Sequence, residues 1–126
     1  MGRDHRKLRV FHDAHALTIE IYRHTRGFPR EEEFGLRSQM RRAAVSVATN
    51  IVEGNARGSE RDYVRFLQIA FGSICELQYL IVLVGELKLV EASIHKALTA
   101  QCDRVVKQLN RLVERMAGGS SENLRP

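Results

Sequence analysis

The sequence has few of the residues that interrupt helices or link a chain covalently. Its 126 residues include two prolines, two cysteines and no tryptophan, and only 6% of them are aromatic. This composition is typical of a helical globular protein. Cys75 and Cys102 lack CxxC spacing, and two lone thiols are typical of a reducing compartment. Because no apolar signal region follows Met1, we expect a cytoplasmic protein.

Long hydrophobic runs are also missing. The most apolar one, LQYLIVLV at residues 77–84, is far too short to span a bilayer and follows Glu76, so we expect no membrane insertion. Acidic residues are outnumbered: the net charge is +5, and residues 1–30 hold seven Lys or Arg against three Asp or Glu. This basic excess permits binding to nucleic acid or to another anionic surface without establishing it.

Apolar residues recur at helical spacing in four segments that short connections separate. An acidic triplet at residues 31–33 suits the positive start of the second helix, and Ser59 with Asp62 forms a variant capping box for the third. The predicted helices cover about residues 10–25, 31–53, 59–88 and 92–116.

Connections of a few residues place successive helices antiparallel. The chain is long enough for one domain with a substantial core, so the sequence predicts an all-α, up-down-up-down four-helix bundle. Three parts are expected: a basic N-terminal arm at residues 1–9, the bundle at residues 10–117, and a disordered tail at residues 118–126.

The third helix is apolar on two sides. One stripe is expected to face the chain's own core: Tyr63, Phe66, Ala70, Ile74, Leu77, Ile81 and Val84. A second lies roughly 140° around the helix: Val64, Phe71, Cys75, Val82 and Leu89. A helix that is apolar on two sides is buried on two sides, which predicts a homo-oligomer with the second stripe at its interface. Scattered surface hydrophobes are the alternative.

A polar stripe runs along the second helix beside its apolar face: Gln39, Arg42, Ser46, Asn50 and Glu53. We expect an interhelical polar network in which Arg42 or another member pairs with Glu76 of the third helix, and Asn50 bonds the backbone at a helix end. Contact with RNA or a protein partner is the alternative. Since the stripe lacks a nucleophile and a base at workable spacing, we expect no enzymatic activity.

Arginines and one lysine form the candidate nucleic-acid surface. Four share a face of the fourth helix, three lie at the end of the first, and one lies in the GNARGSE turn: Arg104, Lys107, Arg111, Arg115, Arg23, Arg26, Arg30 and Arg57. They are expected to contact phosphates without sequence specificity, because aromatic groups for base stacking are scarce near them. A solvated basic face is the alternative.

A metal site is not expected. His12 and His15 are three residues apart on a helix and could both reach a metal ion. A metal site inside a helical bundle, however, needs Glu-x-x-His pairs from facing helices. The GNARGSE turn lacks the Gly-Lys-Ser/Thr of a nucleotide-binding loop. We therefore expect surface histidines and no cofactor.

Residues 27–77, GFPREEEFGLRSQMRRAAVSVATNIVEGNARGSERDYVRFLQIAFGSICEL, carry a specific likeness. This stretch resembles the bacterial 23S rRNA intervening-sequence protein family, also called four helix bundle protein, and the resemblance extends over roughly residues 10–116. The matching residues include Pro29, Leu36, Gln39, Arg42, Ser46, Asn50, Glu53, Gly54, Arg57, Gly58, Ser59, Phe66, Gly72, Ser73 and Glu76.

The resemblance implies a fold and an assembly more than an activity. A related branch is the accessory variability protein of diversity-generating retroelements, a basic pentamer that associates with a reverse transcriptase and nucleic acid. For this chain it implies a non-enzymatic homo-oligomer, a pentamer by analogy, that binds RNA or DNA. A protein-interaction adaptor, for example for a reverse transcriptase or a ribonucleoprotein, is the alternative.

Overall fold

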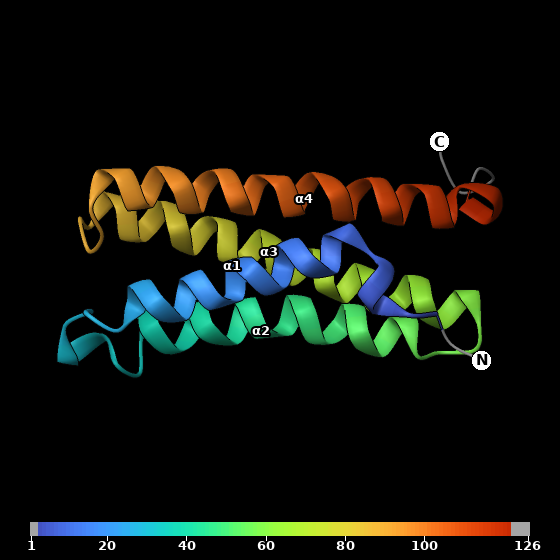
Figure 1. Ribbon diagram of the computed structural model, residues 1–126, viewed down its shortest axis with the longest axis horizontal. Helices are drawn as coiled ribbons and strands as arrows, with labels where there is room; N and C mark the ends of the chain where they lie inside the picture. The colour runs from blue at the N-terminus through green and yellow to red at the C-terminus, as the bar shows by residue number, and fades with distance from the viewer. Residues whose placement is uncertain (1–2, 122–126) are drawn as a thin grey trace.

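Four long helices and two short 3-10 segments make up the computed structural model, which describes residues 3–121 apart from the side chains of residues 117 and 119–121 (Figure 1). The elements are η1 (His5–Lys7), α1 (Arg9–Thr25), η2 (Arg30–Glu32), α2 (Leu36–Asn55), α3 (Glu60–Glu86) and α4 (Ala92–Ser121). Within the described residues there is no strand, which confirms the predicted all-α class.

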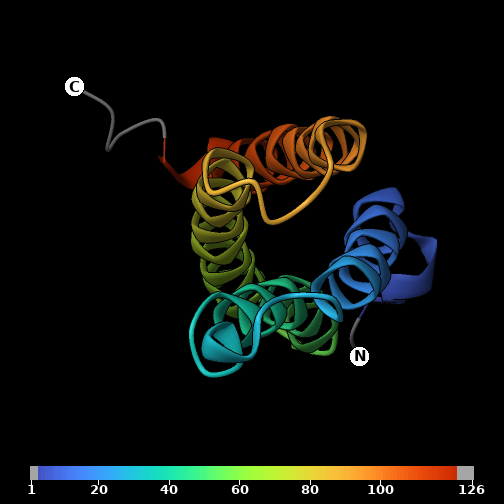
Figure 2. The same ribbon diagram turned by 90° about the vertical axis from the view of Figure 1, so that its left-hand side faces the viewer.

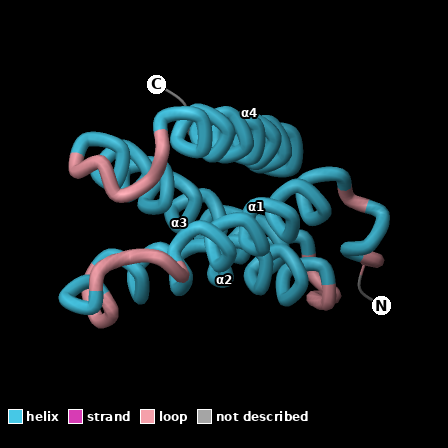
Figure 3. Tube along the Cα trace, turned by 60° about the vertical axis from the view of Figure 1, so that its left-hand side comes forward, coloured by secondary structure: helices cyan, strands magenta, loops and turns pink. Residues whose placement is uncertain are grey.

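The helices alternate in direction along one axis (Figure 1). Each packs against the next in sequence, and α1 also contacts α4. Viewed along the axis, the four helices surround a common interior (Figure 2). The loops gather at the two ends of the bundle (Figure 3). One end therefore holds the α2–α3 turn with the C-terminal part of α4, and the other holds the α1–α2 and α3–α4 loops.

The first predicted stripe of α3 forms the centre of the core. All seven of its residues are buried. Six of them, all except Phe66, belong to one apolar core cluster with residues of the other three helices, which include Leu17 and Ile21 of α1, Val47 of α2, and Leu109 of α4. The 3.6-residue period of the sequence thus identified the inward face of α3 correctly.

Caps at the helix starts follow the sequence in one case and depart from it in another. Ser59 Oγ accepts a hydrogen bond from the Asp62 N–H at 3.1 Å, as the capping box predicted. The acidic triplet, in contrast, does not open α2, which begins only at Leu36. Glu32 caps it from outside, since its Oε1 accepts from the Leu36 N–H at 3.1 Å. The carboxylate still meets the positive helix end, but through a side chain beyond the helix.

A left-handed residue ends α3. Lys88 has φ 57°, its N–H donates to the Gly85 carbonyl at 3.1 Å, and the Leu89 N–H donates to the Val84 carbonyl at 3.0 Å. This pattern is a Schellman motif, which turns the residue after the left-handed position back onto the helix. Leu89 accordingly packs against the chain's own core.

The chain ends differ from the predicted arm and tail. Residues 3–8 contain η1, which contacts α1 and α2, and the Arg3 N–H donates to the Asn55 carbonyl at the end of α2. The arm is therefore docked on the bundle. The helix α4 continues to Ser121, so residues 118–121 are helical rather than part of a disordered tail. The rest of the predicted tail, residues 122–126, lies outside the described residues.

Among the described helices, α3 is long and apolar enough to cross a membrane, with a mean hydropathy of 1.7 over its most apolar window. The apolar run noted in the sequence is thus only part of a longer apolar helix. In the bundle, 39% of that window is buried. A core helix of a soluble protein has the same length and composition, so this property alone does not indicate a membrane protein.

Candidate nucleic-acid interface

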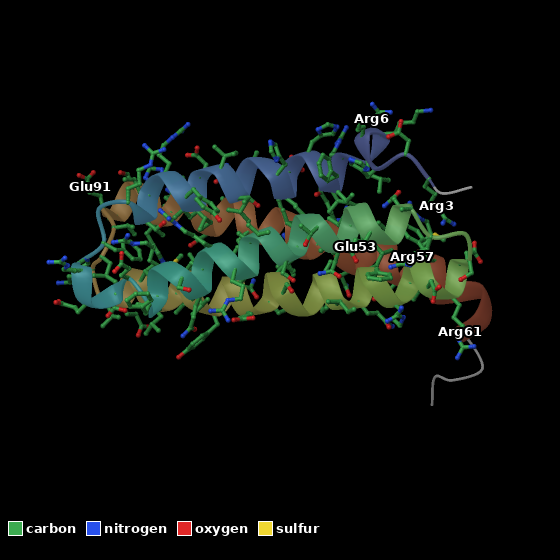
Figure 4. The ribbon with its side chains drawn as sticks, turned by 90° about the horizontal axis from the view of Figure 1, so that it is seen from below. Arg3, Arg6, Glu53, Arg57, Arg61 and Glu91 are labelled. Carbon is green, nitrogen blue, oxygen red and sulfur yellow. The ribbon has the colours of Figure 1, made fainter. Side chains whose placement is uncertain are left out.

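Six arginines gather at the end of the bundle formed by the α2–α3 turn, the N-terminal segment and the C-terminal part of α4. Figure 4 shows Arg3, Arg57 and Arg61 at this end, with Glu91 at the opposite one. The α4 end lies beside the start of α3, because Met116 lines the same surface groove as Arg61 and Arg65. We call this set the basic end: Arg3, Arg57, Arg61, Arg65, Arg111 and Arg115.

Two buried aromatic rings hold part of the basic end in place. The guanidinium of Arg3 lies 4.0 Å from the centroid of the Tyr63 ring. Those of Arg57 and Arg65 lie 4.6 and 4.8 Å from the centroid of the Phe66 ring. Each distance is within the range of a cation–π interaction. Buried aromatic residues of α3 thus orient three exposed cations toward solvent.

Acidic neighbours neutralise the basic end only in part. Arg3 lies 3.9 Å from Glu60 and Arg65 lies 3.8 Å from Asp62, and all four side chains are well exposed. Exposed pairs at such distances are weak and are screened by salt. The other four arginines of the set form no ion pair within residues 3–121. Their charge is available to a phosphate backbone.

The pKa of Tyr63 reflects the same surroundings. Burial raises it above the usual value of 10, and the positive charges of Arg3 and Arg115 lower it to a lesser extent. The contribution of Arg115 agrees with the position of the α4 end beside the start of α3. The site therefore collects charge from three separate parts of the chain.

The predicted nucleic-acid residues are divided among three regions. Arg57, Arg111 and Arg115 lie at the basic end. Arg104 and Lys107 are exposed along the middle of α4, on the helix face that leads to Arg111. Their neighbour Asp103 is directed toward α3, where its Oδ1 accepts from Gln78 Nε2 at 3.0 Å, and its negative charge offsets part of theirs.

The remaining three predicted residues lie at the other end of the bundle, at and after the C-terminus of α1: Arg23, Arg26 and Arg30. All three are exposed. Arg23 is held by Glu20, with 2.6 Å between Nη1 and Oε2. These residues do not join the basic end, so the structure does not assemble the eight predicted residues into a single surface.

The predicted polar network forms in a smaller version. Ser46 and Ser73 hydroxyls are 2.7 Å apart, and Asn50 Nδ2 donates to the Ser46 carbonyl at 2.8 Å and to its hydroxyl at 3.1 Å. These short side chains fit where α2 and α3 approach each other. The longer members Gln39, Arg42, Glu53 and Glu76 are all exposed to solvent.

The expected pairing of Arg42 with Glu76 is absent from the ion pairs of the described residues. Arg42 Nη2 instead donates to Ser38 Oγ at 3.4 Å. The physical reason is exposure: water solvates both charges on the outer sides of their helices, so neither needs a buried counter-ion. Ser73, rather than Glu76, is the α3 side chain that bonds the network.

The second stripe of α3 is less exposed than the sequence indicated. Phe71 and Leu89 pack against the chain's own core, and Val64 and Cys75 are half-buried. Val82 is 44% exposed. The neighbouring helix α4 covers part of this stripe, which the sequence could not show. The apolar surface that remains is shifted around α3.

Two further apolar side chains of α3 that the sequence did not single out are exposed, namely Ile69 and Tyr79, and Tyr79 lies about one turn before Val82. The sequence analysis also missed Arg37 and Arg41 of α2, which line an open groove with aromatic side chains at the α1–α2 end. The signal was present in the RSQMRR stretch at residues 37–42, but those arginines were assigned to the polar stripe or left aside.

Metal-binding and nucleophilic groups are sparse. The described residues contain no group of three His, Cys, Asp or Glu side chains that could hold a metal ion. His12 Nε2 lies 2.6 Å from the Arg6 carbonyl, and His15 stacks on Phe11. Burial raises the pKa of the Cys102 thiol to about 12, which keeps it protonated and unreactive at neutral pH.

Comparison with known proteins gives a family. A family model described as 23S rRNA-intervening sequence protein matches residues 6–111. Among solved structures, the chain is similar to a protein with unknown function from the S23 ribosomal protein family of Bacteroides thetaiotaomicron, with a TM-score of 0.75. The two are 19% identical, and the match covers 83% of this chain and 98% of that one, so this likeness shows the fold alone. No curated protein matches.

Proposed function

The chain belongs to the 23S rRNA-intervening sequence protein family, and from this membership we propose that it is a non-enzymatic, cytoplasmic homo-oligomer that binds RNA. The observation that carries the proposal is the basic end. Exposed arginines from three parts of the chain converge there, and among the described residues only Arg3 and Arg65 of this set form ion pairs, at 3.9 and 3.8 Å. Such a surface suits the regularly spaced phosphates of a nucleic acid.

The binding is electrostatic and recognises phosphates rather than base sequence. At the basic end, Tyr63 and Phe66 are buried beneath their arginines. Their rings therefore orient cations and are not free to stack on bases. Arg104 and Lys107 continue the positive surface along α4, so a nucleic acid could extend from the basic end over the middle of the bundle.

Self-association is supported by the outer face of α3. Tyr79 is 63% exposed on this face and lies about one helical turn before Val82, which is 44% exposed. Gly72 occupies the same helix, where a Cβ would have nothing within 4 Å. Glycine in a helix interior costs about 1 kcal/mol relative to alanine, and nothing within one chain requires it here. A second copy of the chain packed closely on α3 would require it and would cover the apolar side chains.

A salt series tests RNA binding. A short labelled RNA hairpin is titrated with protein from about 50 to 200 mM salt, and the slope of log affinity against log salt is measured. The double variant Arg57→Gln/Arg115→Gln is expected to reduce this slope by about 1.5. The matched control, Lys88→Gln/Lys96→Gln, removes the same charge away from the basic end and should leave the slope unchanged.

Two results would contradict RNA binding through this surface. One is the absence of hairpin binding by the wild type at low salt. The other is an equal loss of slope in the control variant, which would show that the slope depends on the net charge of the protein and not on the basic end. If a protein partner is retained from nuclease-treated lysate while RNA is not bound, the adaptor role replaces the RNA-binding one.

Light scattering tests the assembly. The wild type is expected to show a multiple of the 14.4 kDa chain mass, five by analogy with the family's relatives. Tyr79→Glu should shift the protein toward a single chain, because a carboxylate would be buried without a partner. Leu87→Glu, at an exposed apolar residue beyond the end of α3, should not. A wild type that is a single chain at micromolar concentration would disprove the assembly.

A further inference from the structure

A second candidate site lies at the opposite end of the bundle. An open groove of about 480 Å³ runs between α1, the loop after η2 and the N-terminal half of α2. It lies at the end where the α1–α2 loop is seen in Figure 1. The side chains that matter for the argument are Tyr22, Glu33, Phe34, Arg37, Arg41 and Arg42. The groove combines guanidinium groups with exposed aromatic rings, whereas the aromatic rings of the basic end are buried.

Phe34 projects from this groove into solvent. Its side chain is 88% exposed, whereas Phe28 in the same loop is buried. Burying a phenylalanine side chain is favourable, so the exposed Phe34 can gain free energy by packing against a ligand. Tyr22 is also exposed on the neighbouring α1. Phe34 is thus free for stacking, and Tyr22 is partly free.

The arginines of the groove are held in place. Arg41 Nε donates to Thr25 Oγ1 at 2.9 Å and its Nη2 donates to the Tyr22 carbonyl at 3.2 Å, while its guanidinium lies 4.5 Å from the centroid of the Tyr22 ring. Arg37 Nη2 donates to the Phe28 carbonyl at 3.4 Å. A guanidinium has five donors, so each keeps several for a ligand. Because they are already oriented, little side-chain entropy is lost when a ligand binds.

The charge balance of the groove selects an anion. Arg37, Arg41 and Arg42 are opposed by the single carboxylate of Glu33, and none of the three arginines forms an ion pair among the described residues. Val45 supplies the one aliphatic wall among the lining side chains. That is too little apolar surface for a helix of a protein partner, and a free phosphate would leave Phe34 unused.

We propose that this groove binds unpaired nucleotides of a single-stranded nucleic acid, with a base stacked on Phe34 and phosphates bound by Arg37 and Arg42. Stacking on aromatic rings beside a positively charged groove is the general mode of single-strand binding. Paired bases are already stacked on one another, so a hairpin stem cannot use Phe34. The inference rests on the proposed RNA binding and specifies which part of an RNA is recognised at this end.

The test compares binding of a short unpaired RNA, a DNA of the same sequence, and an RNA hairpin whose stem is closed by a non-nucleotide linker, so that all its bases are paired, by fluorescence anisotropy. Phe34→Ala is expected to weaken binding of the unpaired RNA about 5- to 150-fold, the value of one base stack, and to change hairpin affinity less than about twofold. Its salt slope should be that of the wild type, since no phosphate contact is lost. Leu87→Ala removes another exposed apolar side chain at the same end and serves as the control.

A tryptophan probe reports contact directly. The chain has no tryptophan, so Phe34→Trp gives a single indole signal. Unpaired RNA is expected to quench it, while the hairpin stem should not. The measurement with DNA shows which nucleic acid the groove prefers. Equal quenching by DNA indicates a general single-strand site, and weaker quenching by DNA indicates a preference for RNA.

Three outcomes would overturn the inference. If Phe34→Ala binds unpaired RNA as tightly as the wild type, the groove is not a binding site for unpaired nucleotides. The proposed binding at the basic end, with its salt dependence, would not be affected by this result. A loss of oligomer mass in Phe34→Ala would show that Phe34 contacts another subunit instead. If the wild type binds neither RNA form at low salt, the proposed function fails together with the groove.

Discussion

Replacing Gly54 by alanine is expected to destabilise the bundle by about 1–2 kcal/mol, although alanine is the better helix former. Gly54 is buried near the end of α2, where this helix meets α3. A Cβ there would lie 2.9 Å from Phe66 Cβ and 3.4 Å from Tyr63 Cδ1. Because Phe66 Cβ is bonded to the α3 backbone, no side-chain rotation can remove the contact.

The magnitude follows from two opposing terms. Carbon atoms pack at about 3.5–4.0 Å, so α3 must move away by roughly 0.6 Å or more. Overpacking of this kind costs about 1–3 kcal/mol. Helix propensity returns up to about 1 kcal/mol, and less near a helix end. Since Phe66 and Tyr63 also orient arginines of the basic end, the same substitution should weaken RNA binding.

Urea unfolding monitored by circular dichroism measures the effect, which corresponds to a fall in Tm of roughly 3–10 °C. Gly27→Ala is the control: a Cβ at Gly27 meets nothing within 4 Å and its φ is not positive. That variant should be stabilised by about 0.4–1 kcal/mol through its unfolded state. If Gly54→Ala were as stable as the wild type, the close approach of α2 and α3 at this point would be wrong.

Three further predictions concern other parts of the fold. Lys88→Gly should stabilise the protein by about 1 kcal/mol in urea unfolding, because φ 57° strains a residue with a side chain. Ser46→Ala and Ser73→Ala should each cost about 1 kcal/mol, and a double-mutant cycle should show coupling, because the two hydroxyls are 2.7 Å apart. Maleimide should label Cys75 before Cys102, as mass spectrometry would show. Burial raises the pKa of Cys102 to about 12, whereas the thiol of the unfolded chain ionises near pH 9. The neutral thiol of Cys102 should therefore contribute fully to the free energy of unfolding below about pH 9, and this contribution should be lost as the pH rises through 12.

The sequence predicted those parts of the fold that depend on the spacing of residues within a single helix. The inward stripe of α3 and the Ser59 cap depend only on local spacing, and both are confirmed. Leu89 shows the limit of this reasoning. Its spacing continues the second stripe only if the helix continues, and the left-handed Lys88 turns the chain back first. Helix ends depend on backbone geometry that apolar periodicity does not contain.

The site was harder to predict than the fold because it depends on which helices are neighbours. Tyr22 and Phe34 are twelve residues apart and lie on different elements, so no spacing rule connects them to Arg41. The sequence analysis judged aromatic groups near the basic residues to be scarce. The structure instead brings aromatic rings to the arginines at both ends, buried in one case and exposed in the other.

This difference separates the two ends in function. The groove lies beside the N-terminal half of α2 and the basic end beyond its C-terminus, and a helix of 20 residues spans about 30 Å. Substitutions at such separation act independently, so the free-energy losses of Phe34→Ala and Arg57→Gln should add. Additivity should hold for an RNA that combines a stem with an unpaired tail. An RNA stem without an unpaired tail should respond to Arg57→Gln alone, because buried rings orient cations toward phosphates, whereas only an exposed ring can stack on an unpaired base.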